Sequence, residues 1–145
     1  MIGEIENKIK TIISDNLEDY FGDAWLVKGL PRNIYTKAKK MADDRTYDLL
    51  FNNDDADDIK IWDFVPLSDY QAIVLNGKNW STFFEDIMVR PEETKIAGGK
   101  EAKTQWILRL SAIKNKLSKE SYSVPVDEYS YVKSIHDWIM DMLTL

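Results

Sequence analysis

The sequence contains no cysteine, only one histidine and no long apolar run. The absence of cysteine excludes a disulfide framework and a thiolate metal site, and it fits a reducing compartment. No apolar stretch approaches the roughly 20 residues of a membrane-spanning helix, and no signal peptide is recognisable. We therefore expect a cytoplasmic protein, or an excised domain, without membrane association.

Several motifs that carry enzyme chemistry are also missing. The chain has no glycine-rich phosphate loop, no zinc-binding cluster and no nucleophile elbow. Its 25 acidic residues make carboxylate pairs common, but no spacing marks one of them as a catalytic dyad. The acidic run at residues 52–58 lacks the glycine of a calcium-binding EF-hand loop. We therefore predict neither a metal nor a cofactor.

The chain has 145 residues and a formal net charge of −6 at pH 7. This length suits one domain that buries about 68–70% of the surface of the extended chain. The acidic total argues against general coating of nucleic acid, because such binding depends on neutralised phosphates, although a local basic site remains compatible with it. We interpret the five tryptophans and seven tyrosines as core and helix-interface residues rather than as a platform for stacking bases.

Hydrophobic residues recur at helical spacing along much of the chain, which predicts an all-α fold. The first helix spans residues 2–21 and ends at Gly22, and the last spans residues 127–142. The expected buried face of the first helix is Ile2, Ile5, Ile9, Ile12, Ile13, Asn16, Leu17 and Tyr20. That of the last is Tyr131 or Val132, Ile135, Trp138, Ile139 and Met142. We expect an antiparallel helical bundle of about four main helices with short extra helices, in a single domain over residues 1–145.

Shorter elements are predicted between these helices. Residues 23–30 form an apolar clip at one end of the bundle, Pro31 opens a basic helix over residues 32–42, and residues 43–58 form a solvated connector. Residues 59–66 lead in extended form to the next part of the chain. The remaining elements are a helix over 69–75 capped by Ser68, a helix over 80–89 capped by Asn79, a linker over 90–99 and a loop over 121–126.

The most distinctive stretch is an amphipathic, basic helix predicted over residues 104–119. Trp106, Leu110, Ile113 and Leu117 share its apolar face. Residues 100–120 contain six Lys or Arg against two Glu, a local charge of +4 in an acidic protein. The candidates for binding nucleic acid are Lys103, Arg109, Lys114, Lys116 and Lys119. On composition alone, a solvated face whose lysine stems cover apolar surface is the simpler interpretation.

Several short motifs also occur in a characteristic order. They are Ile5-Glu6, residues 19–25, Leu30-Pro31, residues 64–75, residues 79–84, residues 110–119 and residues 127–139. Together they resemble a HEPN domain (higher eukaryotes and prokaryotes nucleotide-binding), of the subtype fused to PIN-type nucleases and to prokaryotic defence ATPases. The resemblance covers nearly the whole chain and depends on the order and spacing of these motifs.

The resemblance implies a helical bundle that commonly dimerises and that, in active members, cleaves RNA without a metal. Active members use Arg and His from a signature helix, in the pattern Arg-Asn, two variable residues, a small residue and His. Here Lys114 stands at the Arg position, Asn115 is retained, Ser118 is the small residue and Lys119 replaces the His. Lysine, with a pKa near 10.4, stays charged where imidazole titrates near pH 6.5, and losing a placed general acid or base typically costs about 10²–10⁴-fold.

These substitutions lead us to three hypotheses. The first is a non-catalytic HEPN-like domain for RNA or protein recognition or dimeric assembly, within a prokaryotic defence or RNA-related system. The second is an RNA endonuclease that works with the altered residues Lys114, Asn115 and Lys119, with a contribution from His136. The third is a protein-binding helical module unrelated to RNA. We interpret His136, at the edge of the last helix's apolar stripe, as structural rather than catalytic.

Overall fold

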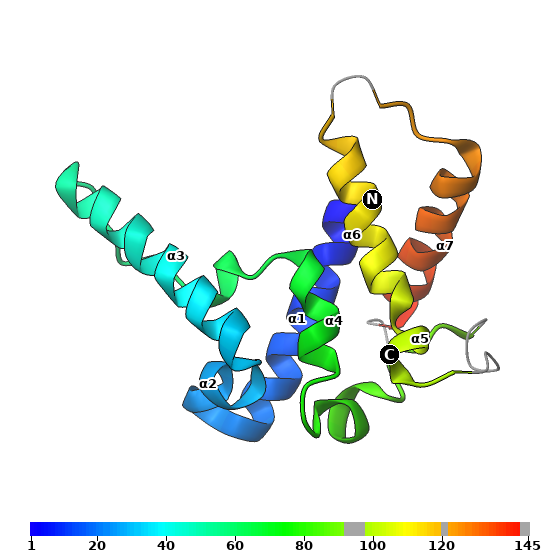
Figure 1. Cartoon of the computed structure of the whole chain (residues 1–145), viewed down its shortest axis with the longest axis horizontal. Helices are drawn as coiled ribbons and strands as arrows, with labels where there is room; N and C mark the ends of the chain where they lie inside the picture. Colours follow the sequence, from blue (N-terminus) through cyan, green and yellow to red (C-terminus); the bar gives the residue numbers. More distant parts are fainter. Residues whose placement is uncertain (92–97, 120–121, 143–145) are drawn as a thin grey trace.

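The computed structural model describes residues 1–91, 98–119 and 122–142. Within these residues all regular structure is helical, which confirms the predicted fold class (Figure 1). The long helices are α1 (Ile2–Phe21), α3 (Arg32–Phe51), α6 (Gln105–Leu117) and α7 (Val126–Met142). The shorter elements are η1 (Gly22–Ala24), α2 (Trp25–Gly29), η2 (Ile61–Phe64), η3 (Leu67–Asp69), α4 (Tyr70–Val74), η4 (Trp80–Phe84) and α5 (Lys100–Lys103).

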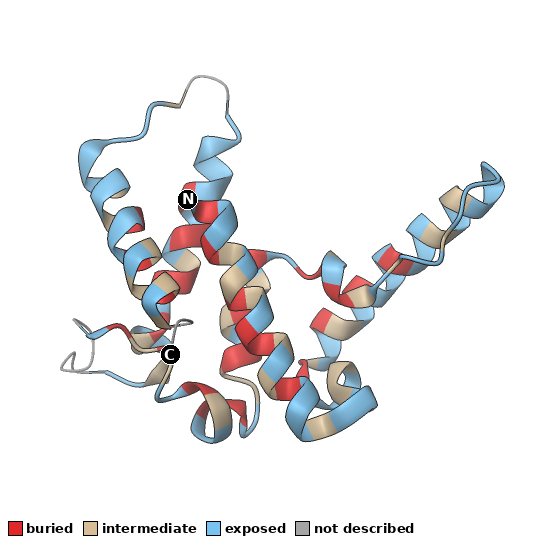
Figure 2. Ribbon diagram, turned by 180° about the vertical axis from the view of Figure 1, so that it is seen from behind, coloured by how far each residue is buried: buried red, intermediate tan, exposed pale blue. Residues whose placement is uncertain are grey.

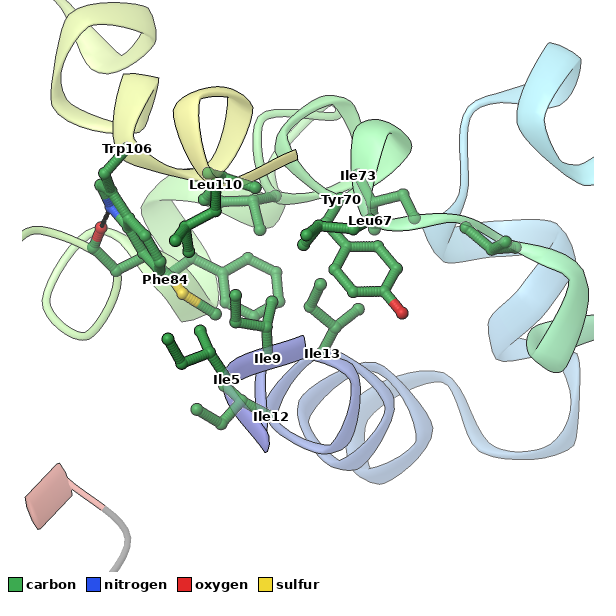
Figure 3. Close-up of a cluster of buried hydrophobic side chains, with 14 of the residues drawn as sticks. Ile5, Ile9, Ile12, Ile13, Leu67, Tyr70, Ile73, Phe84, Trp106 and Leu110 are labelled. Atoms are coloured by element: carbon green, nitrogen blue, oxygen red, sulfur yellow. Dashed lines mark hydrogen bonds between the residues drawn. The ribbon is translucent and has the colours of Figure 1, made fainter. Parts of the chain in front are cut away.

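Helix α1 lies at the centre of the body and contacts α2, α4 and α7. Its isoleucine face is fully buried against side chains from η3, α4, η4 and α6 (Figure 3). The residues of this cluster include Ile5, Ile9, Ile13, Leu67, Tyr70, Ile73, Phe84, Trp106 and Leu110. The predicted apolar face of α1 is therefore confirmed except at its last position, since Tyr20 is 66% exposed.

The predicted basic helix over residues 104–119 is broken at Thr104. Helix α5 ends at Lys103, α6 begins at Gln105, and α6 ends at Leu117 rather than Lys119. The fully buried Thr104 hydroxyl donates to the Lys100 carbonyl at 2.8 Å and accepts from Gln71 Nε2 at 3.0 Å. A hydroxyl that bonds back to the preceding turn bends or interrupts a helix. Leu117, expected on the buried face, is 43% exposed.

The predicted solvated connector over residues 43–58 is wrong in its first half, because α3 continues to Phe51. This helix projects from the body as an arm (Figures 1 and 2). Its covered stripe of Ile34, Ala38 and Ala42 is buried, and η2 packs against α3. The chain between the tip of α3 and η2 therefore returns along the covered side, and we call residues 52–60 the return segment.

Asn53 explains where the arm ends. It adopts a left-handed conformation with φ of 58°. Its amide donates to the Leu50 carbonyl at 3.1 Å, and the Asp54 amide donates to the Leu49 carbonyl at 2.8 Å. This pair of bonds is the Schellman motif, in which Asn is the usual substitute for Gly. The sequence signal for this cap was the Asn52-Asn53 pair.

The shorter predictions also need correction. The predicted helix over 69–75 is the turn η3 followed by α4, so Ser68 lies inside η3 instead of capping a helix. The helix predicted over 80–89 is regular only in the π-helical element η4. Residues 59–66 contain the 3₁₀ turn η2 instead of being extended throughout. The apolar clip over 23–30 is confirmed in part, since Trp25 and Leu26 pack on the core while Val27 is 63% exposed. Most of the predicted linker over 90–99 and the start of the loop over 121–126 lie outside the described residues.

Asn79 does not cap η4 as predicted but joins three segments of the body. Its buried side-chain amide donates to the Gly29 carbonyl at 2.8 Å and to the Ile73 carbonyl at 2.9 Å. Gly29 itself approaches α1 closely, since a Cβ there would lie 2.9 Å from Leu17 Cδ1. Asn79 thus holds the end of α2 and the end of α4 together.

We predict that Asn79→Ala lowers the free energy of unfolding by about 1–3 kcal/mol, because two buried hydrogen bonds lose their donor. Urea denaturation monitored by circular dichroism measures this loss. Asn76→Ala is the matched control, since Asn76 donates only one such bond, at 3.1 Å to the same Gly29 carbonyl, from a half-buried position. Equal losses in the two variants would contradict the prediction.

Candidate functional site

The structure disperses the residues predicted to bind nucleic acid. Lys103 ends α5, whereas Arg109, Lys114 and Lys116 lie on the exposed surface of α6. Lys119 lies two residues beyond the end of α6. The six cationic positions between residues 100 and 119 therefore do not form one continuous helical row.

Two of these lysines form ion pairs within the chain. Lys114 Nζ lies 2.7 Å from Glu6 Oε2 of α1, and Lys116 Nζ lies 3.2 Å from Glu128 Oε1 of α7. Each lysine side chain is about half exposed, so each pair contributes at most about 1 kcal/mol to stability. Both pairs nevertheless reduce the positive charge that this face could offer to phosphate groups.

The side chain of Arg109 contacts α7. Its guanidinium carbon lies 3.8 Å from the centroid of the Tyr131 ring, and that of Arg90 lies 5.1 Å from the same centroid. Arg90 also donates to Ser134 Oγ at 3.1 Å. Such cation–π contacts stabilise by about 0.5–2 kcal/mol. The main role that the structure gives Arg109 is therefore to join α6 to α7, a role that the sequence analysis missed.

Glu128 and Tyr122 form a second link between these elements. The Tyr122 hydroxyl donates a short hydrogen bond to Glu128, which also accepts from Lys116. The bond from Tyr122, followed by the bond and charge of Lys116, lowers the pKa of Glu128 below its usual value. The same carboxylate raises the pKa of Tyr122 to about 12.

His136 is not placed with the signature residues. Its Nε2 lies 3.3 Å from Glu4 Oε2, and its Nδ1 lies 3.5 Å from Asp137 Oδ1. Within the described residues, no hydrogen bond or ion pair joins it to Lys114, Asn115 or Lys119. This geometry favours the structural interpretation of His136, and among the described residues it brings no imidazole into hydrogen-bonding distance of Lys114, Asn115 or Lys119.

A shallow pocket of about 280 Å³ lies between the end of α1, α2 and η4. Tyr20 and Phe83 meet edge to face on one wall, with ring centroids 5.2 Å apart. Lys28 and Lys78 also line the pocket, and neither has an ion-pair partner among the described residues. The two ammonium groups favour an anion by charge, although the volume lies just below the usual range for a ligand site.

A group of exposed apolar side chains lies on the outer half of α3. Tyr47, Leu50 and Phe51 are 64%, 59% and 83% exposed, respectively. All three lie in the stretch, residues 43–58, that the sequence analysis assigned to a solvated connector. A second set of exposed apolar side chains surrounds a small groove where the end of α6 approaches the start of α7, and it includes Met1, Leu117, Val124 and Tyr129.

No helix in the described part of the chain has the length and apolar character needed to cross a membrane. Comparison with known proteins found no matching family model, curated protein or solved structure.

We predict that Tyr122 ionises about two pH units later than an ordinary tyrosine. Its folded pKa is raised from 10.0 to about 12, so the stability that this bond contributes is complete below pH 10 and is lost as the pH rises from 10 to 12. Glu128 has a lowered pKa, so its contribution is lost instead when the pH falls below the usual carboxyl range.

The measurement is the tyrosinate absorbance of the wild type minus that of Tyr122→Phe, followed through an alkaline titration. Glu128→Gln removes the carboxylate and is expected to return the ionisation of Tyr122 towards pH 10. A wild-type difference curve with its midpoint near pH 10 would show that the hydrogen bond to Glu128 does not raise the pKa of Tyr122.

Proposed function

We propose that this chain is a non-catalytic, HEPN-like helical domain that serves recognition or assembly, as a dimer or as a module of a larger protein in a prokaryotic defence or RNA-related system. The observation that carries the proposal is the exposed face of α3. This helix extends away from the body and presents an aromatic tip to solvent. Exposed apolar side chains grouped in this way are typical of interaction sites.

The state of the signature helix supports a non-catalytic role. Lysine replaces both the Arg and the His of the family pattern at positions 114 and 119. Lys114 is paired with Glu6, and lysine lacks the planar fork that grips a phosphate at two points. For the alternative, a nuclease that uses these residues, no hydrogen bond among the described residues joins Lys114, Asn115 or Lys119 to the imidazole of His136.

We predict that the α3 tip mediates association of the full chain. Tyr47→Ser combined with Phe51→Ser is expected to reduce self-association, measured by light scattering behind size exclusion across a concentration series, because it removes two of the most exposed aromatic side chains. Leu117→Ser combined with Tyr129→Ser is the matched control, since it removes exposed apolar surface at the groove beside α6 and α7. A wild type that is strictly monomeric at high concentration, or association that depends on the control pair, would contradict the proposal.

We also predict no RNA cleavage by the purified chain above that of a buffer blank. Mixed RNA is incubated with the wild type and with Lys119→Ala, and the products are separated by electrophoresis. Cleavage by the wild type that disappears in Lys119→Ala would establish the nuclease alternative instead.

A further inference from the structure

We propose that two copies of this chain pair through the exposed faces of their α3 helices, with the helices antiparallel. The inference rests on the proposed assembly function and names its partner and its orientation. The partner is a second copy of the chain because the exposed face of α3 is complementary to itself.

The spacing of the exposed residues provides the first argument. A continuous row runs along α3 at alternating steps of four and three residues, and every member is exposed. We call this row the seam, and it consists of Asn33, Lys37, Lys40, Asp44, Tyr47 and Phe51. The steps are those that separate the a and d positions of paired helices. Four of the six residues are polar or charged, so this contact depends on opposed charges and on the two aromatic residues. The opposite side of α3 is covered by η2, so the seam is the face that remains for a second helix.

The charge distribution provides the second argument. Within α3, residues 32–40 contain four basic and no acidic residues, whereas residues 43–51 contain three aspartates and one arginine. Two parallel copies would place like charges side by side along the whole arm. Two antiparallel copies place the basic half of each arm against the acidic half of the other, and complementary potentials of this kind set the orientation of association.

One register satisfies both the spacing and the charge distribution. In this register each seam residue lies opposite a seam residue of the second copy, and the two residue numbers of each opposed pair add up to 84. Lys40 then lies opposite Asp44 of the second copy, and this pair occurs twice because of the two-fold symmetry. Lys37 lies opposite Tyr47, where a lysine stem and ammonium can cover an aromatic ring. Asn33 lies opposite Phe51 at each end.

The size of the contact sets the strength to expect. Helix α3 has 20 residues, so the contact is about 30 Å long at 1.5 Å per residue. Stable interfaces bury roughly 1,200 Å² or more, and this contact consists of one face of one helix from each copy. We therefore expect a reversible dimer with a Kd on the order of 10–100 µM, weaker at high salt because its charged pairs are exposed.

The test uses sedimentation of the full chain with charge-reversed seam residues. Lys40→Asp alone places aspartate against aspartate, and Asp44→Lys alone places lysine against lysine. Each single variant is expected to raise the Kd about tenfold or more, because two symmetric pairs become repulsive. An equimolar mixture of the two variants is expected to associate as tightly as the wild type, because the heterodimer restores both pairs.

Matched controls make the same charge changes away from the seam. Lys60→Asp and Asp58→Lys alter exposed residues at the end of the return segment, on the covered side of α3. Both are expected to leave the Kd within about twofold of the wild type. Far-ultraviolet circular dichroism of every variant establishes that the arm is still helical.

Orientation is tested with engineered cysteines, since the chain has none of its own. Under mild oxidation, Asn33→Cys mixed with Phe51→Cys is expected to give a disulfide-linked heterodimer, while neither variant forms a linked homodimer. Linked homodimers of Asn33→Cys would instead indicate parallel arms and would overturn the proposed orientation.

The outcomes separate this inference from the proposed function. Association that is lost on changing Tyr47 and Phe51 but is indifferent to Lys40→Asp and Asp44→Lys would overturn the antiparallel register and leave the assembly function intact. A mixture of the two charge variants that associates no better than either alone would also overturn the register. A chain that stays monomeric at all concentrations would overturn both.

Discussion

The burial of one face of α1 is the constraint on which the rest of the structure depends. Ile5, Ile9, Ile13 and Leu17 are fully buried, and each contributes roughly 1.5–3 kcal/mol when it is removed from water. The elements that cover this face come from distant parts of the chain, between η3 and α7. The inner residues Ile34 and Ala38 of α3 join this core, whereas no residue of α3 beyond Ala42 is buried. The arm is the part of α3 that the core does not cover.

The second organising feature is a set of contacts between the charged side chains of α6 and the neighbouring helices. The surface of α6 looks basic in sequence, but Lys114, Lys116 and Arg109 are directed at a carboxylate or a tyrosine ring of a neighbouring helix. These contacts hold α6 to both α1 and α7. The excess of basic residues in α6 therefore reflects contacts between helices more than a surface for binding phosphate groups.

The sequence was sufficient to predict the elements with strong helical periodicity. The faces of α1 and α7 were largely correct, because apolar residues recur at regular helical spacing in both, and α1 alone has six isoleucines or leucines on its buried face. The end of α3 was missed because its outer half is stabilised by features that periodicity does not register, namely the Lys39–Asp43 pair at 2.8 Å, the small residues of the covered stripe and the cap at Asn53.

The contacts of the candidate site were harder to foresee than its residues. Lys114 and Lys116 could be chosen by charge, but their partners Glu6 and Glu128 are separated from them by 108 and 12 residues, respectively. The exposure of the α3 tip could not be predicted because Tyr47 and Phe51 are residue types that are usually found in a core. Only the packing of the body shows that there is no core within their reach.

The arm differs from the body in how its stability is distributed. Beyond its buried inner half, α3 is supported mainly by its own backbone bonds and by a segment close to it in sequence, so its outer turns can open while the packed centre stays closed. The backbone amides of residues 46–51 should then exchange with solvent much faster than those of α1. Folding of the two parts can accordingly proceed at different rates, since the arm needs only local contacts whereas the body must bring together segments more than a hundred residues apart.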